Sequence, residues 1–199
     1  MTDLRTIEII EYDYVSARRL ALTPDVCRGL EKRYIAFDTE TTGLDPESDR
    51  IVEFGAVLFE SGVPADSFQC YVNPGVSISE EVSALNHISN EILQTAPSEA
   101  VAYRKFLDFI GDAANSGTII CGHVVAFDLS FLCRRMEKLG LTGHFRFVDT
   151  RQLAVHIPEL EHHSLGAVAQ HLGISYEMAH HAREDALTSG RILWRILGK

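Results

Sequence analysis

Apolar residues are distributed differently in the two halves of the chain. Residues 34–37 form a continuous apolar run that predicts a buried strand, and residues 50–60 and 64–73 are extended stretches in which apolar positions partly alternate. Residues 62–64, Gly-Val-Pro, separate those two stretches and predict a hairpin turn. We therefore expect three consecutive strands in an antiparallel meander.

Beyond residue 73 the apolar residues recur at intervals of three and four, which is the spacing of one face of a helix. The predicted helices cover residues 77–86, 89–94, 97–115, 125–140, 164–174 and 183–197, and two short buried strands cover residues 117–123 and 145–150. Because strands and helices alternate here, we predict an α/β fold. Its mixed sheet joins the antiparallel meander to parallel strands and carries helices on both faces.

Residues 1–33 differ from the rest because they carry no chemical motif. They contain an apolar patch at Ile7, Ile9 and Ile10, and residues 16–33 have a helical pattern. The 199-residue chain is 46% hydrophobic, which is enough for one sizeable core, and it is too short for two ordinary domains. We predict a leader of unknown role over residues 1–33 and one domain over residues 34–199.

The chain is acidic, with a formal net charge of −10 and a pI near 5.3. This composition argues against a protein that grips long duplex nucleic acid, because that mode of binding needs a basic face. An acidic chain still acts on the end of a nucleic acid when bound metal supplies the positive charge locally.

Cysteine usage and hydropathy indicate a cytoplasmic protein with no membrane partner. The four cysteines are widely spaced, form no CxxC pair and follow no secretory signal, which is a pattern of reduced thiols. The first residues are too charged for a signal peptide, and no apolar run approaches the length of a membrane span.

Two carboxylates, Asp38 and Glu40, follow directly on the first strand of the meander. Side chains alternate along a strand, so residues two apart point to the same face and these carboxylates are held side by side. Two anions crowded at the edge of a core are unfavourable unless a positive charge lies between them. The pair therefore indicates a cation site.

Two further acids lie beside buried segments. Asp128 opens a predicted helix just after a short strand, and Asp185 lies in the final helix with His180 and His181 upstream. Taken singly, Asp128 has an alternative role at a helix N-terminus, and Asp185 has one as an exposed helix acid. Mg²⁺ and Mn²⁺ prefer carboxylate oxygen, and a pair of ions needs several carboxylates from different elements. The four acids together suit a two-metal site for in-line phosphoryl chemistry.

A histidine near such a site is a candidate general base, because the pKa of imidazole lies near neutrality. In a continuous helix His181 lies four residues before Asp185 and shares its face, whereas His180 lies five residues before it and points away. Helical spacing alone therefore favours His181. If the helix begins after both histidines, His180 lies on a loop and helical spacing does not fix its direction.

Three segments resemble the motifs of the DnaQ-like 3′-to-5′ exonucleases of the DEDDh type. They are FDTETTGL from residue 37, GHVVAFDLSFL from residue 122 and HHAREDA from residue 180. This family contains polymerase proofreading subunits, RNase T and oligoribonuclease, and the resemblance covers about residues 34–195 with the motifs in the family's order. It implies a ribonuclease H-like fold, two Mg²⁺ or Mn²⁺ ions, removal of nucleotides from 3′ ends and release of nucleoside 5′-monophosphates.

The resemblance also implies roles for individual residues. The implied metal ligands are Asp38, Glu40, Asp128 and Asp185. The implied general base is His180, because only that histidine fits the family pattern His-x-Ala-x-x-Asp-Ala. The implied substrate contacts are Thr41, Gly43 and Leu44, with Leu44 against a base, and Phe127 either packs beneath the site or touches the substrate. Base stacking tolerates any sequence, so we expect little base specificity.

The sequence departs from the family pattern at two places. Val124 stands where the family often has Asn, so the side-chain amide is absent here. Asn86 and His87 stand at the His and Gly positions of a segment usually written His-Gly-Ile-Thr. A substrate role for either residue stays an open hypothesis.

The motifs favour a metal-dependent exonuclease acting on the 3′ ends of single-stranded or frayed DNA, and two alternatives stay open. An RNA 3′-end trimming enzyme would use the same residues, because DNA and RNA offer the same phosphate and 3′ hydroxyl. A non-catalytic module that binds a DNA polymerase predicts a degraded acid set, whereas all four acids and the histidine are present. The chain stops soon after the last motif, which favours a stand-alone enzyme over a proofreading subunit unless residues 1–33 dock to a polymerase.

Overall fold

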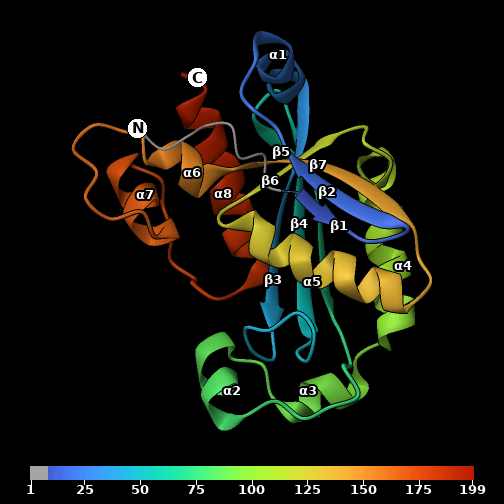
Figure 1. The fold of residues 1–199 in the computed structure, drawn as a ribbon. Coiled ribbons are helices and arrows are strands. Elements are labelled where there is room, and N and C mark those ends of the chain that lie inside the picture. Colours follow the sequence, from blue (N-terminus) through green and yellow to red (C-terminus); the bar gives the residue numbers. More distant parts are fainter. Residues whose placement is uncertain (1–8) are drawn as a thin grey trace.

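The computed structural model describes residues 9–199, which form a seven-stranded sheet with the order β1-β2-β7-β6-β3-β4-β5 (Figure 1). The strands are β1 Ile9–Glu11, β2 Val15–Arg19, β3 Arg33–Thr41, β4 Ile51–Glu60, β5 Val63–Tyr71, β6 Ile119–Gly122 and β7 Gly143–Asp149. Strands β3, β4 and β5 pair antiparallel, whereas β2, β7, β6 and β3 pair in parallel. The mixed sheet with its antiparallel meander is therefore confirmed.

Helices cover both faces of the sheet, as predicted. They are α1 Pro24–Lys32, α2 Glu80–Asn86, α3 Asn90–Thr95, α4 Glu99–Ile110, α5 Val125–Lys138, α6 Thr150–Ala154, α7 Leu165–His171 and α8 Ala182–Ile196, with a 3₁₀ turn at Gly111–Ala114. Buried residues of α4 and α5 form one core with the sheet, and those of α1 and α8 form a second core with its other face. Figure 1 shows α2 and α3 beyond the carboxyl end of β3.

Strand β3 separates the two cores. Ile35 and Phe37 are buried in the core that contains α4 and α5, whereas Tyr34 and Ala36 are buried in the core that contains α1 and α8. This alternation is the period of two that strand geometry dictates. Both faces of β3 are apolar until residue 37, which explains why its sequence is a continuous apolar run.

The same alternation directs the polar residues that end β3. Asp38 and Glu40 continue the face that packs on α8, and Thr39 continues the face that packs on α5. The strand therefore presents its two carboxylates toward the last helix of the fold.

Tyr34 fixes α8 on this face. Its ring stacks on Phe59 of β4 with ring centroids 4.8 Å apart, and its hydroxyl donates a buried 3.0 Å hydrogen bond to the carbonyl of Gly190 in α8. A buried hydroxyl needs such a partner. The contact ties the middle of α8 to the strand that carries the acid pair.

The helix predicted over residues 16–33 is only partly present. Residues 15–19 form β2, which pairs in parallel with β7 and buries Val15 and Ala17 in the core that contains α5. The helix begins only at Pro24, and the hydroxyl of Thr23 accepts a hydrogen bond from the N–H of Val26 at its N-cap. Pairing with a strand distant in sequence overrides the local helical pattern. The division into a leader and a domain at residue 33 stays a prediction, and Ile7 lies outside the described residues.

The hairpin turn between β4 and β5 lies one residue earlier than predicted. Ser61 and Gly62 both have positive φ angles, 50° and 77°, and Val63 already begins β5. Two-residue turns with two positive φ angles match the twist of paired strands. Pro64 is tolerated inside β5 because this strand lies at the edge of the sheet.

Within residues 9–199 no helix is long and apolar enough to cross a membrane. All four cysteines are free thiols, and Cys121 and Cys133 are buried.

Candidate active site

The acid pair of β3 lies where the strand leaves the sheet. Asp38 is the cross-strand partner of Gly55 and Glu40 is the partner of Glu53, and the register shifts directly after Glu40. Glu40 is 9% exposed and Asp38 is half-buried. A register shift of this kind bends a strand and re-aims its side chains. Pairing continues past the shift with Thr41 opposite Ile51, so the irregularity lies directly after the two carboxylates that share one face.

Asp128 lies in the first turn of α5 and is only 4% exposed. Its Oδ1 accepts two hydrogen bonds from Thr39, one from the backbone N–H at 2.9 Å and one from the hydroxyl at 2.7 Å. These bonds bring the predicted helix-opening acid to the end of β3, beside the acid pair.

The third motif is divided between a loop and a helix. Helix α8 begins at Ala182 with His181 as its N-cap, so His180 lies outside the helix, where its φ is 61°. Asp185 lies in the first turn of α8 and is 7% exposed. Helical spacing therefore does not apply to His180. The spacing that favoured His181 over His180 assumed a continuous helix through both histidines, and that helix is absent.

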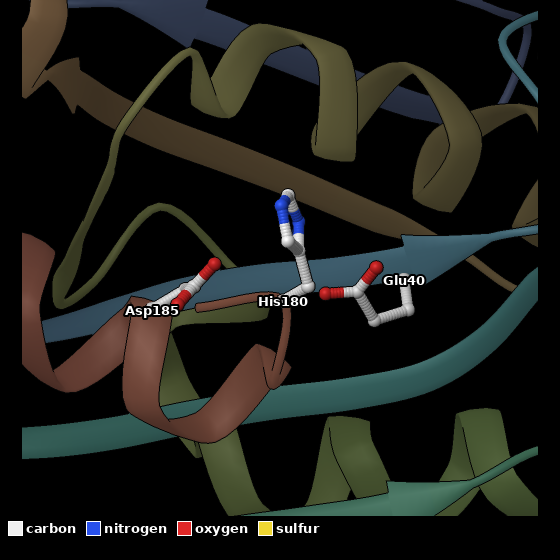
Figure 2. A group of neighbouring side chains, drawn as sticks. All are labelled: Glu40, His180 and Asp185. Carbon is white, nitrogen blue, oxygen red and sulfur yellow. The ribbon is translucent and has the colours of Figure 1, made fainter. Parts of the chain in front are cut away.

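One ligand atom each from Glu40, His180 and Asp185 lies within 4.8 Å of the others. Figure 2 shows the imidazole of His180 standing between the two carboxylates. The Oδ1 atom of Asp185 is buried and has no hydrogen-bond partner among the described residues. A buried carboxylate oxygen without a partner is unfavourable and suits a site that binds a cation.

Crowding and burial raise the affinity of the acid pair for protons. Burial raises the pKa of Asp38 well above its usual range, and the charges of Asp128, Asp185 and Glu40 raise it further. Burial also raises the pKa of Glu40 to about 8, with Asp185 as the first charge that adds to the rise. Each carboxylate therefore hinders the ionisation of the others.

At the two helix acids, hydrogen-bond donors oppose the rise in pKa that burial causes. Burial raises the pKa of Asp128 to about 7, against the hydrogen bonds from Thr39. Burial raises the pKa of Asp185 to about 6, against a hydrogen bond from the hydroxyl of Tyr176. Within residues 9–199 no lysine or arginine forms an ion pair with any of the four acids. The donor set of clustered oxygens fits hard divalent cations such as Mg²⁺ or Mn²⁺.

The loop after the bulge presents Leu44, whose side chain is 84% exposed. Asp49 folds this loop, because its Oδ1 accepts from the hydroxyl of Thr42 at 2.9 Å and its Oδ2 accepts from the N–H of Asp45 at 3.0 Å. A Cβ at Gly43 would lie 2.4 Å from the carboxylate of Asp49, so a larger residue there would displace the side chain that folds the loop. The hydrogen bonds of Asp49 hold the loop, and the side chain of Leu44 projects into solvent, where a base could contact it.

The other two predicted substrate contacts are less exposed. The hydroxyl of Thr41 donates to the carbonyl of Gly43 at 2.6 Å, which closes the start of the loop. Phe127 packs against Phe131 on α5 with ring centroids 4.9 Å apart and against the core beneath α5. Phe127 therefore packs against the core, and its role at the site stays a prediction.

Val124 precedes α5 in the left-handed region, with φ 65° and ψ 29°, and is 42% exposed. That conformation is strained for a β-branched residue, whereas Asn adopts it readily. The N–H of Val124 donates to Oδ1 of Asp149 at 3.2 Å, and the same atom caps α6. At this departure from the family pattern, Val occupies a backbone conformation that suits Asn better.

Asn86 and His87 join α2 to the segment before α3. Oδ1 of Asn86 accepts from the N–H of Ile88 at 3.0 Å inside a buried turn. His87 has a φ of 59°, and its ring stacks on that of His181 with centroids 5.8 Å apart and an angle of 29° between the ring planes. Asn86 therefore has a structural role, and His87 contacts the segment that carries His180.

Three residues around the site were not singled out in the sequence. Glu53 is fully buried on β4 opposite Glu40, and its only local signal is a carboxylate inside an apolar strand pattern. Tyr176 reaches Asp185 from a loop that has no periodicity, and Asp49 organises the loop of Leu44 from five residues away. Both Tyr176 and Asp49 lie outside the three motifs.

The comparisons with known proteins agree with this geometry. A sequence model of the family described as Exonuclease (RNase T) matches residues 35–193. The DNA polymerase III PolC-type of Clostridium perfringens is 35% identical over 176 residues, 86% of this chain and 12% of that protein. The corresponding protein of Thermotoga maritima is 29% identical over 218 residues, 99% of this chain and 16% of that protein. The chain thus spans only a small part of the length of these curated relatives.

Solved structures share the fold at low identity. The nuclease domain of 3′hExo, described as a DEDDh family member bound to rAMP, has a TM-score of 0.71 at 21% identity, over 84% of this chain and 92% of that one. E. coli exonuclease I in complex with a dT13 oligonucleotide has a TM-score of 0.70 at 18% identity, over 83% of this chain and 41% of that one. The likeness confirms the predicted ribonuclease H-like architecture.

Proposed function

We propose that this chain, which belongs to the DnaQ-like 3′-to-5′ exonuclease family, removes nucleotides one at a time from the 3′ ends of single-stranded or frayed DNA. The products would be nucleoside 5′-monophosphates. The single observation that carries the proposal is the meeting of Glu40, His180 and Asp185 within 4.8 Å, beside Asp38 and the anchored Asp128.

The proposed metal ligands are Asp38, Glu40, Asp128 and Asp185. Their raised pKa values and the buried, unpartnered Oδ1 of Asp185 support a site that becomes favourable when cations neutralise it. Two Mg²⁺ or Mn²⁺ ions, when bound, would lower the pKa of an attacking water and stabilise charge on the scissile phosphate and the leaving oxygen.

His180 is the proposed general base. Its exposed ring lies next to Glu40 and Asp185 and outside the helix, where the ring reaches solvent and substrate. A base must come within hydrogen-bond reach of the proton that it takes. We assign His180 the role of taking the proton from the attacking water at one ring nitrogen.

The terminal nucleotide would be held by the loop after β3. Leu44 offers an exposed apolar side chain for a base, and Thr41 and Gly43 shape the backbone beside it. Phe127, in the first turn of α5, would support the nucleotide site from the side of the core. Apolar contact with a base is tolerant of sequence, so we propose little base specificity.

DNA is the proposed substrate because the relatives of higher identity carry the name DNA polymerase III PolC-type. Proofreading or repair beside a DNA polymerase is the proposed setting.

RNA 3′-end trimming is the second candidate, favoured by the structural neighbour described as bound to rAMP. A non-catalytic module bound to a polymerase ranks below both, since all four acids and His180 are present. The residues assigned to chemistry lie between positions 38 and 185, inside the proposed domain of residues 34–199.

The test uses 5′-labelled DNA and RNA single strands of the same sequence, incubated with the protein in Mg²⁺, in Mn²⁺ or in chelator. A metal-dependent ladder that shortens from the 3′ end, and is absent for Asp128→Ala, supports the exonuclease. The faster of the two ladders identifies DNA or RNA. No cleavage of either strand with either metal would refute the proposal and favour the binding module.

A further inference from the structure

We propose that Glu53 is a positioning residue, which holds the start of α8 and thereby sets His180 and Asp185 over the acid pair of β3. The inference rests on the proposed function, because it assigns His180 and Asp185 their roles. Glu53 would act through these residues and would not itself touch a metal ion or the substrate.

Glu53 shares the face of the acid pair. It is the cross-strand partner of Glu40, and Gly55 is the partner of Asp38. Directly opposed residues of an antiparallel pair point to the same side, so all four positions face α8. Glu53 is 0% exposed, so its carboxylate must find its partners inside the protein.

Both oxygens of Glu53 are hydrogen bonded. Oε1 accepts from the side-chain amide of Gln69 on β5 at 2.6 Å, and Oε2 accepts from the backbone N–H of Ala182 at 3.3 Å. With both oxygens occupied, Glu53 also stays outside the group of close ligand atoms formed by Glu40, His180 and Asp185.

Ala182 is the first residue of α8, and the first N–H groups of a helix have no partner within it. The usual solution is a side-chain cap from the preceding residue, but His181 makes no such hydrogen bond. Glu53 supplies the missing acceptor from a neighbouring strand. A carboxylate is also the favoured charge at a helix N-terminus.

Gly55 makes this contact possible. A Cβ at residue 55 would lie 2.0 Å from the carbonyl carbon of Ala182, so the backbone of α8 rests directly on β4. The first turn of α8 is thus fixed by close packing at Gly55 and by a hydrogen bond at Glu53. His180 lies two residues before this fixed point and Asp185 three residues after it. Loss of the hydrogen bond would loosen both.

The experiment compares Glu53→Ala, Glu53→Gln and Gln69→Ala with the unmodified protein, and Glu60→Gln at the exposed end of β4 is the control. The first measurement is amide hydrogen exchange at Ala182 without metal or substrate. The second is steady-state kinetics on a single-stranded DNA with Mg²⁺. Gln69 is exposed on an edge strand, so Gln69→Ala should fold even if Glu53→Ala does not.

For Glu53→Ala we expect faster exchange at Ala182 and a kcat about 10- to 100-fold lower, as for other residues that orient catalytic groups. KM should stay within about threefold, because the substrate contacts are untouched. Glu53→Gln keeps an acceptor and should restore most of the kcat. Gln69→Ala should change exchange and kcat in the same direction by a smaller factor, and Glu60→Gln should change neither.

Unchanged exchange at Ala182 in both Glu53→Ala and Gln69→Ala would overturn the inference, as would faster exchange with unaltered kcat. A rise in KM at constant kcat would also overturn it, because it would assign Glu53 to substrate binding. If the unmodified protein cleaves no strand, the proposed function fails, and the exchange measurement alone decides whether Glu53 holds α8.

Discussion

Thr39 donates both its backbone N–H and its hydroxyl to one atom, Oδ1 of Asp128, at 2.9 and 2.7 Å. The two residues lie 89 positions apart in the chain, and both are buried. This pair of bonds joins β3 to α5 at the point where the proposed metal ligands meet. It also opposes the rise in the pKa of Asp128 that burial causes.

Thr39→Val should therefore weaken both the fold and the site. The variant keeps the shape of the side chain and removes one bond to a buried carboxylate, so we expect a loss of about 1.5 to 3 kcal/mol in the free energy of unfolding. Urea denaturation in chelator measures this loss. Thr95→Val makes the same chemical change at an exposed position and should cost less than about 0.5 kcal/mol. Equal losses in the two variants would contradict the role of Thr39.

The stability of the metal-free protein should fall as pH rises from about 5 to about 8.5. The folded pKa values of Glu40, Asp128 and Asp185, about 8, 7 and 6, exceed those of free carboxyls. A raised folded pKa means that the folded state binds more protons than the unfolded state, so deprotonation through this window destabilises it. Thermal unfolding in chelator measures the slope, which Mg²⁺ or Mn²⁺ should remove. A melting temperature that rises across the same window in chelator would refute this prediction.

His180→Ala should lower kcat about 10²- to 10⁴-fold, the usual contribution of a general base. His181→Ala should have a smaller effect, because His181 is the N-cap of α8 and stacks on His87. Single-turnover cleavage of DNA with Mn²⁺ compares the two variants under identical conditions. A larger loss in His181→Ala would assign the base to His181 instead.

Leu44→Ala should reduce activity without reducing stability. The side chain is 84% exposed, so its truncation should change the free energy of unfolding by less than about 0.5 kcal/mol. The loss of apolar contact with a base should cost about 1 to 2 kcal/mol in kcat/KM, the scale of partial burial of a leucine side chain. Wild-type kcat/KM in a folded Leu44→Ala protein would remove Leu44 from the proposed nucleotide site.

Val124→Asn should stabilise the protein. Asn relieves the strain of a β-branched residue at φ 65°, and non-glycine residues in this region cost of the order of 1 kcal/mol or more. Thermal unfolding should shift upward by a few degrees for a gain of about 1 kcal/mol. Val155→Asn, at an exposed residue without positive φ, is the matched control and should not shift it. A lower melting temperature for Val124→Asn would show that the valine side chain makes a compensating contact.

The sequence predicted best the positions of acidic residues that lie in or beside a regular strand or helix. Asp38 and Glu40 could be set on one face because a strand alternates, and Asp128 could be set at a helix start because a short strand precedes it. The choice between His180 and His181 depended on a helix boundary, which spacing alone does not determine and which lies at Ala182. The strand at residues 15–19 was missed because its pairing with β7 depends on residues more than a hundred positions away.

Supporting residues were harder to predict than the proposed ligands. Glu53 lies outside the three motifs, and its proposed role follows from its register with Glu40 and from its hydrogen bond to the N–H of Ala182. Tyr176 depends on the path of a loop in the same way. The roles of such residues depend on tertiary contacts, which the local sequence pattern around them does not predict.

The docking of α8 on β3 has a consequence for the order in which the protein matures. Synthesis proceeds from the N-terminus, and the chain delivers Asp38, Glu40 and Asp128 well before Asp185 and His180. A nascent chain that ends before residue 182 exposes the face of Tyr34 and Ala36 that α8 covers, and it lacks the fourth carboxylate. The four proposed metal ligands are therefore brought together only after α8 has been synthesised and has packed on β3.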